Sequence, residues 1–164
     1  MRIKARFPWE RKRFLQTTYL YIIFLEFSAL VSLFMTAIRT ASGDLAGVLA
    51  YLTTSALFLT SVLTNKEFYR LIRRTRFSVY WMQLRANSSP YGGYASLYVI
   101  ASILFFTADL LKGGYLLLAL LLLFRGFFEY LLDRSRTDMI AASFLFYTLG
   151  EGDLESSEIR DPFR

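Results

Sequence analysis

Three ionisable side chains interrupt long apolar stretches of the sequence: Glu26, Arg125 and Glu129. An ionised group at the centre of a bilayer costs roughly 2.5 to 3.5 kcal/mol on insertion scales, so such a residue needs a partner or a function. Arg125 and Glu129 have the i, i+4 spacing that lets side chains meet on one helix face. With a rise of about 1.5 Å per residue, Glu26 and Arg125 lie at nearly the same depth. We therefore predict an intramembrane charge cluster in which Arg125 contacts both carboxylates.

This charge cluster has four candidate uses. It can clamp two helices of one bundle through a desolvated ion pair, contact another subunit, carry a proton or an ion, or take part in catalysis. Translocation normally uses a chain of ionisable groups across the membrane, and residues 45–64 contain none. We favour the clamp and keep the subunit contact and translocation as alternatives.

Neither cysteine nor histidine occurs in the chain. Their absence excludes disulfides, thiolate chemistry, histidine-held haem, the usual zinc and copper sites and any catalytic triad that needs an imidazole. The sequence also lacks a nucleotide-binding glycine loop and a nucleophile beside a base. We expect no enzyme activity, no cofactor and no metal site.

Long uncharged blocks of sequence must position Glu26, Arg125 and Glu129. Of the 164 residues in the chain, 55 % are apolar. A membrane-crossing helix needs roughly 20 predominantly apolar residues. The blocks that reach or approach that length are 17–38, 44–64, 94–111 and 115–132. A soluble bundle is excluded, because each of its helices must present a polar face to water. We predict an all-α, polytopic membrane protein with four transmembrane helices.

Short turns join these helices in pairs. Residues 39–43 connect the first pair and residues 112–114 connect the second, and turns this short force antiparallel hairpins. The predicted organisation is a basic cytoplasmic arm (1–16), transmembrane hairpin 1 (17–64), a basic amphipathic cytoplasmic loop (65–93), transmembrane hairpin 2 (94–132), a short cytoplasmic or interfacial helix (133–150) and an acidic tail (151–164). Residues 139–149 either lie in the interface or continue the fourth span.

Acidic residues near the two turns have local interpretations. Asp44 stands where the second span begins, and the helix macrodipole favours an acid there. Asp109 and Lys112 are three residues apart and can pair along one helix face. Both acids are therefore expected to be interfacial.

The central loop has the pattern of an amphipathic helix. Over residues 65–85, one side of a helical wheel is apolar and the other is basic. The apolar side holds Phe68, Leu71, Ile72, Val79 and Met82, and the basic side holds Lys66, Arg70, Arg73 and Arg74. We predict a helix lying on the cytoplasmic membrane surface, with these basic residues contacting anionic lipids of the inner leaflet. The positive-inside rule already accounts for them, so we expect no nucleic-acid binding.

Orientation follows from the distribution of lysine and arginine. The basic residues crowd into the N-terminal arm, the central loop and the segment after the last span, whereas the short turns offer only Arg39 and Lys112. Cytoplasmic flanks carry the excess of basic residues. We therefore predict a multi-pass protein of the cell membrane with both termini in the cytoplasm.

Small and hydroxylated residues recur at helix-packing spacing. Ser28, Ser32 and Thr36 follow one another every four residues in the first span, and Gly43 and Gly47 make a small-xxx-small step in the second. Such residues let helices approach closely. Packing inside one bundle is the preferred interpretation, and a dedicated dimer motif is the alternative.

These observations favour a non-catalytic integral membrane protein, a small subunit or assembly partner of a larger membrane complex. The expected partners are other membrane subunits or further copies of this chain, together with membrane lipids. The alternative is a small oligomeric transporter or channel in which Glu26 and Arg125 line the route, and the third interpretation is a membrane-embedded enzyme.

Overall fold

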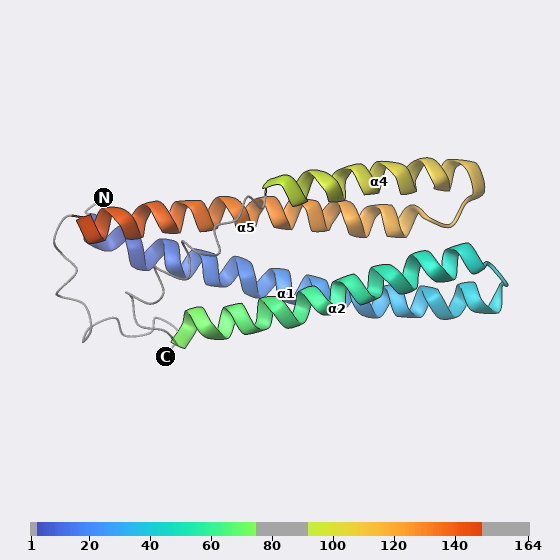
Figure 1. The fold of residues 1–164 in the computed structure, drawn as a ribbon, viewed down its shortest axis with the longest axis horizontal. Coiled ribbons are helices and arrows are strands. Elements are labelled where there is room, and N and C mark those ends of the chain that lie inside the picture. Colours follow the sequence, from blue (N-terminus) through green and yellow to red (C-terminus); the bar gives the residue numbers. More distant parts are fainter. Residues whose placement is uncertain (1–2, 75–91, 149–164) are drawn as a thin grey trace.

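The computed structural model describes residues 3–74 and 92–148, and these two ranges are almost entirely helical (Figure 1). The helices are α1 (Ile3–Ala41), α2 (Leu45–Arg74), α4 (Gly92–Lys112) and α5 (Leu116–Thr148). No strand occurs within the described ranges, so the predicted all-α class is confirmed. The acidic tail at 151–164 and the second half of the predicted amphipathic loop lie outside the described residues.

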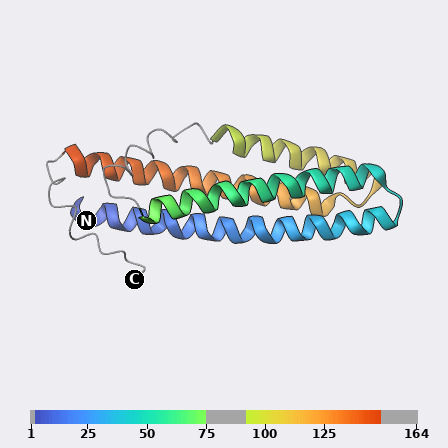
Figure 2. The same ribbon diagram turned by 60° about the horizontal axis from the view of Figure 1, so that its bottom comes forward.

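The helices form two antiparallel hairpins, as predicted. α1 and α2 form one hairpin, α4 and α5 form the other, and α1 packs against α5 to join them (Figures 1 and 2). Glycines make the sharp turns possible: Gly43 has a φ of +72°, and Gly113 and Gly114 have φ values of +73° and +87°. Residues with a Cβ rarely adopt this left-handed backbone.

Three helices are longer than their apolar blocks, which corrects the predicted segment boundaries. α1 begins at Ile3, so the basic arm is the first part of α1. α5 continues unbroken to Thr148, which agrees with the alternative that residues 139–149 continue the fourth helix. Thr17 and Thr137 lie near the predicted boundaries, and their hydroxyls donate hydrogen bonds to the carbonyls of Arg13 and Asp133 in their own helices. Neither residue caps a new helix.

α2 also continues beyond its apolar block, through Arg74. Residues 65–74 are therefore part of a helix that runs along the bundle, and not the start of a separate helix lying on the membrane surface. α1, α2 and α5 all extend past the first residue of α4 (Figure 1). We call this part the three-helix extension: residues 3–18 of α1, 66–74 of α2 and 131–148 of α5.

The three-helix extension has an apolar core of its own. Phe14, Leu15 and Met139 are fully or almost fully buried there, with Leu132 beside them. Phe68 of α2 meets the Phe14 ring edge-on, with ring centroids 6.2 Å apart. Burial of these side chains keeps α1, α2 and α5 together where α4 is absent.

Three helices are long and apolar enough to cross a membrane: Trp9–Ala41 in α1, Leu45–Arg70 in α2 and Ala95–Lys112 in α4. α5 does not meet the same measure, because Arg125, Glu129 and Asp133 interrupt its apolar half. The structure is therefore consistent with a membrane protein, and it supports three candidate spans.

Large apolar side chains are exposed along all four helices, over a band that we call the apolar belt. The belt is formed by Tyr19, Leu20, Ile23, Phe27, Leu30, Leu33, Phe34 and Ile38 of α1, Leu45, Leu49, Leu52, Leu57, Leu59 and Leu63 of α2, Leu97, Val99, Ile100, Ile103, Leu104, Phe106, Leu110 and Leu111 of α4, and Leu116, Leu120, Leu123, Phe124, Phe127 and Tyr130 of α5. On the described surface of the three-helix extension, Trp9 is the one exposed large apolar side chain. Such a band suits contact with lipid hydrocarbon.

The predicted packing residues divide into two groups. Ser28 and Ser32 are completely buried, and Thr36 is partly buried, so this stripe lies inside the bundle and is not a face for a second copy. Gly47 lies against Asp44 and Arg39, but no atom lies within 4 Å of the position of a Cβ on Gly43. Gly43 is therefore a turn residue and not a packing residue.

Candidate functional site

Arg125 on α5 is the most buried charged residue in the described part of the chain, with 4 % of its surface exposed. Its Nη2 donates a hydrogen bond of 2.6 Å to Ser61 Oγ of α2. Its guanidinium carbon lies 4.2 Å from the ring centroid of Tyr98 on α4 and 5.1 Å from that of Phe58 on α2. Cation–π contacts of this kind strengthen when the cation is desolvated. Arg125 therefore joins α5 to α2 and α4.

The predicted ion pair between Glu26 and Arg125 is wrong. The carboxylate of Glu26 instead pairs with Nζ of Lys66, and both side chains are 42 % exposed. Equal depth was the reason for the prediction, but depth alone does not put two residues on facing sides of their helices. Lys66 reaches Glu26 because α2 continues as a helix past residue 64 and packs against α1.

Glu129 lies one turn beyond Arg125 on α5, yet its hydrogen-bond partner is on α1. The hydroxyl of the fully buried Tyr21 donates to Glu129 Oε1. Nε and Nη1 of Arg125 are buried without a hydrogen-bond acceptor, so the predicted pairing of Arg125 with Glu129 is not formed either. The three predicted residues thus make three separate interhelical contacts.

A polar pocket of about 360 Å³ lies beside Arg125, between α2, α4 and α5. Its lining is Thr60, Ser61, Thr64, Asn65, Phe68, Tyr98, Arg125, Glu129, Leu132 and Arg136. Arg136 also reaches across to α2, where its guanidinium carbon lies 5.7 Å from the Phe68 ring centroid. The two arginines and one glutamate give this pocket a net positive charge.

An apolar hollow of about 330 Å³ lies on the same side of the bundle, nearer the two turns. It is lined by Ala46, Ala50, Phe105, Ala108, Leu111, Lys112 and Tyr115. Ser61 follows Ala50 by eleven residues, which is three helical turns, and Phe105 follows Tyr98 by seven, which is two. The polar pocket and the apolar hollow therefore lie along one groove between α2 and α4, which we call the α2–α4 groove.

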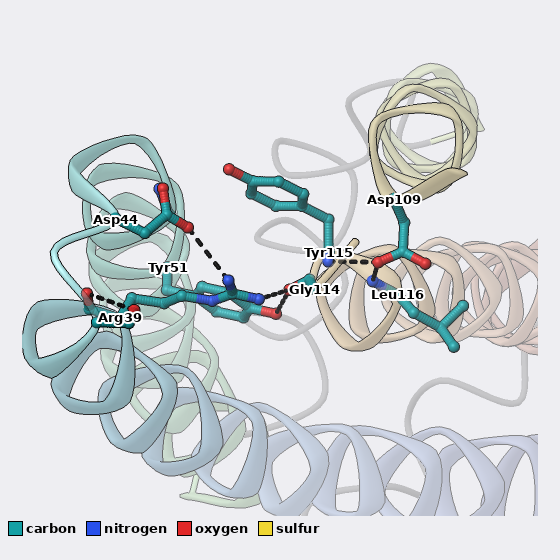
Figure 3. Close-up of polar contacts among 9 residues, drawn as sticks. Arg39, Asp44, Tyr51, Asp109, Gly114, Tyr115 and Leu116 are labelled. Carbon is teal, nitrogen blue, oxygen red and sulfur yellow. Dashed lines mark hydrogen bonds and ion pairs between the residues drawn. The ribbon is translucent and has the colours of Figure 1, made fainter. Parts of the chain in front are cut away.

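A second polar network joins the two hairpins at the end of the bundle where their turns lie (Figure 3). Arg39 pairs with Asp44 through an Nη1–Oδ2 contact of 3.2 Å, and it also donates to the carbonyl oxygen of Gly114. The hydroxyl of Tyr51 donates to the same carbonyl at 3.1 Å. Arg39 also lies over the Tyr115 ring, with 5.7 Å between the guanidinium carbon and the ring centroid. No sequence pattern indicates this role, because a lone arginine in a turn is typical of an ordinary interfacial charge.

Both interfacial acids cap helices. Asp44 Oδ1 accepts a 3.1 Å hydrogen bond from the Gly47 amide, which confirms its interpretation as an acid at a helix N-terminus. Asp109 Oδ1 accepts from the amides of Tyr115 at 2.6 Å and Leu116 at 2.9 Å, at the start of α5 (Figure 3). Asp109 therefore stabilises the turn of the second hairpin through these backbone amides.

The basic residues predicted to contact lipid lie on the final turns of α2. Lys66 is held by Glu26, and Arg70 and Arg73 are exposed. The carbonyl of Arg73 accepts a hydrogen bond of 3.5 Å from Arg11 of α1, which ties α2 to α1. The side chain of Arg74 lies outside the described part of the structure.

Comparison with protein-family models, with curated proteins and with solved structures finds no match to this chain.

Changing Tyr21 to phenylalanine tests the contact between α1 and α5. The change removes the hydroxyl that donates to Glu129 and leaves that carboxylate without its partner, so we expect a loss of about 1 to 3 kcal/mol in unfolding free energy. Thermal unfolding in detergent measures the loss. Tyr19→Phe is the matched control, because Tyr19 is on the same helix but 54 % exposed. Equal effects at both positions would show that the Tyr21 hydroxyl carries no interhelical stability.

Proposed function

We propose that this chain is a non-catalytic integral membrane protein with four transmembrane helices, acting as a small subunit or assembly partner of a larger membrane complex. The proposal rests on the contacts that its three charged residues within the apolar stretches make. Arg125 joins α5 to α2 and α4, Glu129 joins α5 to α1, and Glu26 joins α1 to α2. Each charge is engaged in an interhelical contact, which is the behaviour of a structural clamp.

The fourth span of this proposal is the first half of α5. Its exposed side chains from Leu116 to Tyr130 continue the apolar belt of the other helices. Arg125 interrupts that stretch in sequence, but its burial keeps it away from lipid. Charged residues in transmembrane helices normally face the bundle interior in this way. The first half of α5 therefore has the surface of a membrane span despite its charges.

The proposed orientation places the three-helix extension in the cytoplasm at the cell membrane. Its exposed basic residues include Lys12, Arg13, Arg70, Arg73 and Arg134. Such residues favour the cytoplasmic side, and they provide a basic surface for anionic lipid or for acidic segments of other subunits.

A transporter or channel remains the alternative function, and one observation favours the subunit over it. Between Arg125 and the two turns, the α2–α4 groove is lined by alanines, Phe105 and Leu111 with only Lys112 at its end. A route for ions or protons needs polar groups along its length. The groove therefore supports binding better than passage.

Native mass spectrometry of the protein, extracted in mild detergent from the membranes of its source, tests the proposal. We expect a defined hetero-complex, and charge reversal in Arg70→Glu with Arg134→Glu is expected to lower the amount of co-purified partner. Lys112→Glu, at the other end of the bundle, is the control and should retain the partner.

A closed homo-oligomer without other subunits would contradict the subunit proposal, and so would an isolated monomer. Purified protein in liposomes should show no proton or cation flux above empty vesicles. Reproducible flux that disappears in a folded Glu26→Gln variant would establish the transporter instead.

A further inference from the structure

We propose that the α2–α4 groove binds one anionic phospholipid, with the lipid phosphate at Arg125 and an acyl chain along the apolar hollow. The inference concerns a site inside the bundle and does not depend on whether the chain is a subunit of a complex. It rests on two features of the groove: an incompletely compensated cation, and a polarity that changes along its length.

The cation is Arg125. Its hydrogen bond to Ser61 and its ring contacts with Tyr98 and Phe58 come from uncharged groups, and its Nε and Nη1 have no acceptor. A buried charge without a counter-charge is costly in a medium of low polarity. A phosphate group in the pocket supplies the missing counter-charge, and arginine is a common partner of phosphate in proteins.

The charge balance of the polar pocket favours an anion. Arg136 lines the same pocket as Arg125, and Glu129 is the one acid among the lining residues. Glu129 already accepts a hydrogen bond from Tyr21, which helps to compensate its charge from the α1 side. The pocket therefore offers an excess of positive charge, and Asn65 adds an amide at its edge. Headgroup recognition by basic pockets between transmembrane helices is a known form of lipid binding.

The rest of the groove suits an acyl chain. Its small side chains, Ala46, Ala50 and Ala108, leave room between α2 and α4, while Phe105 and Leu111 supply apolar surface. From Ser61 to Ala50 the helix rises about 16 Å, which is close to half of the roughly 30 Å hydrocarbon core. Because the apolar hollow lies nearer the two turns, a lipid with its phosphate at Arg125 extends its chain through the bilayer centre toward the turns.

Lipid binding to the purified full-length protein tests the site. The probes are phosphatidylglycerol, zwitterionic phosphatidylcholine and water-soluble glycerol phosphate, each added to delipidated protein in neutral detergent. We expect native mass spectrometry to show one retained phosphatidylglycerol per chain, with a higher unfolding temperature at saturating lipid. Phosphatidylcholine should bind at least about tenfold more weakly, and glycerol phosphate should not stabilise the protein.

Two variants address the two ends of the lipid. Arg125→Gln removes the charge, and Ala50→Phe fills the apolar hollow while leaving every charge in place. Each is expected to weaken phosphatidylglycerol retention by about tenfold or more. Ala56→Phe is the matched control, because Ala56 is exposed on α2 and does not line the groove, so its retention should equal that of the wild type.

Several outcomes would overturn the inference. Unchanged retention in folded Ala50→Phe would exclude the acyl chain from the groove, and this variant keeps the test decisive if Arg125→Gln does not fold. Equal stabilisation by glycerol phosphate would assign the pocket to a soluble anion. A stable dimer that phosphatidylglycerol neither requires nor dissociates, and that Ala50→Phe breaks, would assign the groove to a second copy of the chain.

Discussion

Replacing Gly114 with alanine is expected to lower the unfolding free energy by roughly 3 kcal/mol, the largest effect that we predict. Two costs add. Gly114 has a φ of +87°, a conformation that costs an L-residue roughly 1 to 2 kcal/mol. A Cβ there would also lie 1.6 Å from Arg39 Nη2, so the guanidinium must leave its place.

The displaced guanidinium is what makes the effect large. Arg39 joins the turn of one hairpin to the turn of the other through Asp44 and the Gly114 carbonyl (Figure 3). Displacing it therefore breaks the lock between the hairpins as well as straining one residue. Thermal unfolding of the purified protein in detergent measures the loss.

Gly113→Ala is the matched control in the same turn. Gly113 has a φ of +73°, but no atom lies within 4 Å of the position of its Cβ, so this variant reports the backbone cost alone. In an Arg39→Ala background, the cost of Gly114→Ala should fall to that of Gly113→Ala, because the obstructing side chain is gone. If Gly114→Ala costs no more than Gly113→Ala in the wild-type background, the Arg39 lock does not stabilise the protein.

The hairpins were predictable from the sequence because they depend on local properties. The lengths of the apolar blocks predict the long apolar helices, and a three-residue turn with glycine permits only an antiparallel return. The helix ends were not predictable by the same reasoning. A change from apolar to charged residues marks where hydrophobicity ends, but backbone hydrogen bonding continues through it, as α2 does to Arg74 and α5 does to Thr148.

The partners of the charged residues were harder to predict than the residues themselves. Glu26, Arg125 and Glu129 stand out as charges among apolar neighbours. Of the residues that contact them, Ser61 and Tyr21 have no distinctive sequence pattern, and Lys66 was assigned to lipid contact. Which residues meet depends on the rotation and offset of each helix about its axis. Those quantities follow from the packing of the whole bundle, and pairwise depth arguments do not contain them.

Gly126 was also missed in the sequence analysis, although the neighbouring helix α4 leaves little room for a side chain at this position. It is buried in the interface of α5 with α4, where a Cβ would lie 3.0 Å from the Ala95 carbonyl oxygen and 3.3 Å from Val99 Cγ2. A single glycine between Arg125 and Phe127 makes no small-xxx-small pattern with a neighbour on its own helix. The close approach of α4 is what requires it.

Gly126→Val is expected to destabilise the protein by roughly 2 to 3 kcal/mol, the second large effect that we predict. Gly126→Ala places only the Cβ against the Ala95 carbonyl and should be milder, since a shift of a few tenths of an ångström relieves the contact. Valine adds two methyl groups toward α4, where Tyr98 Cβ already lies 3.4 Å from the Cβ position. α4 must then move away from α5.

Ala56→Val separates this packing effect from the lower helix propensity of valine, because Ala56 is exposed on α2. Thermal unfolding should show a much larger loss at residue 126 than at residue 56. The same movement of α4 withdraws Tyr98 from the Arg125 guanidinium, 4.2 Å away, and opens the α2–α4 groove. Phosphatidylglycerol retention should therefore fall in Gly126→Val at temperatures where the protein is still folded, and remain normal in Ala56→Val. Equal losses of stability at the two positions would mean that the close approach of α4 does not depend on Gly126.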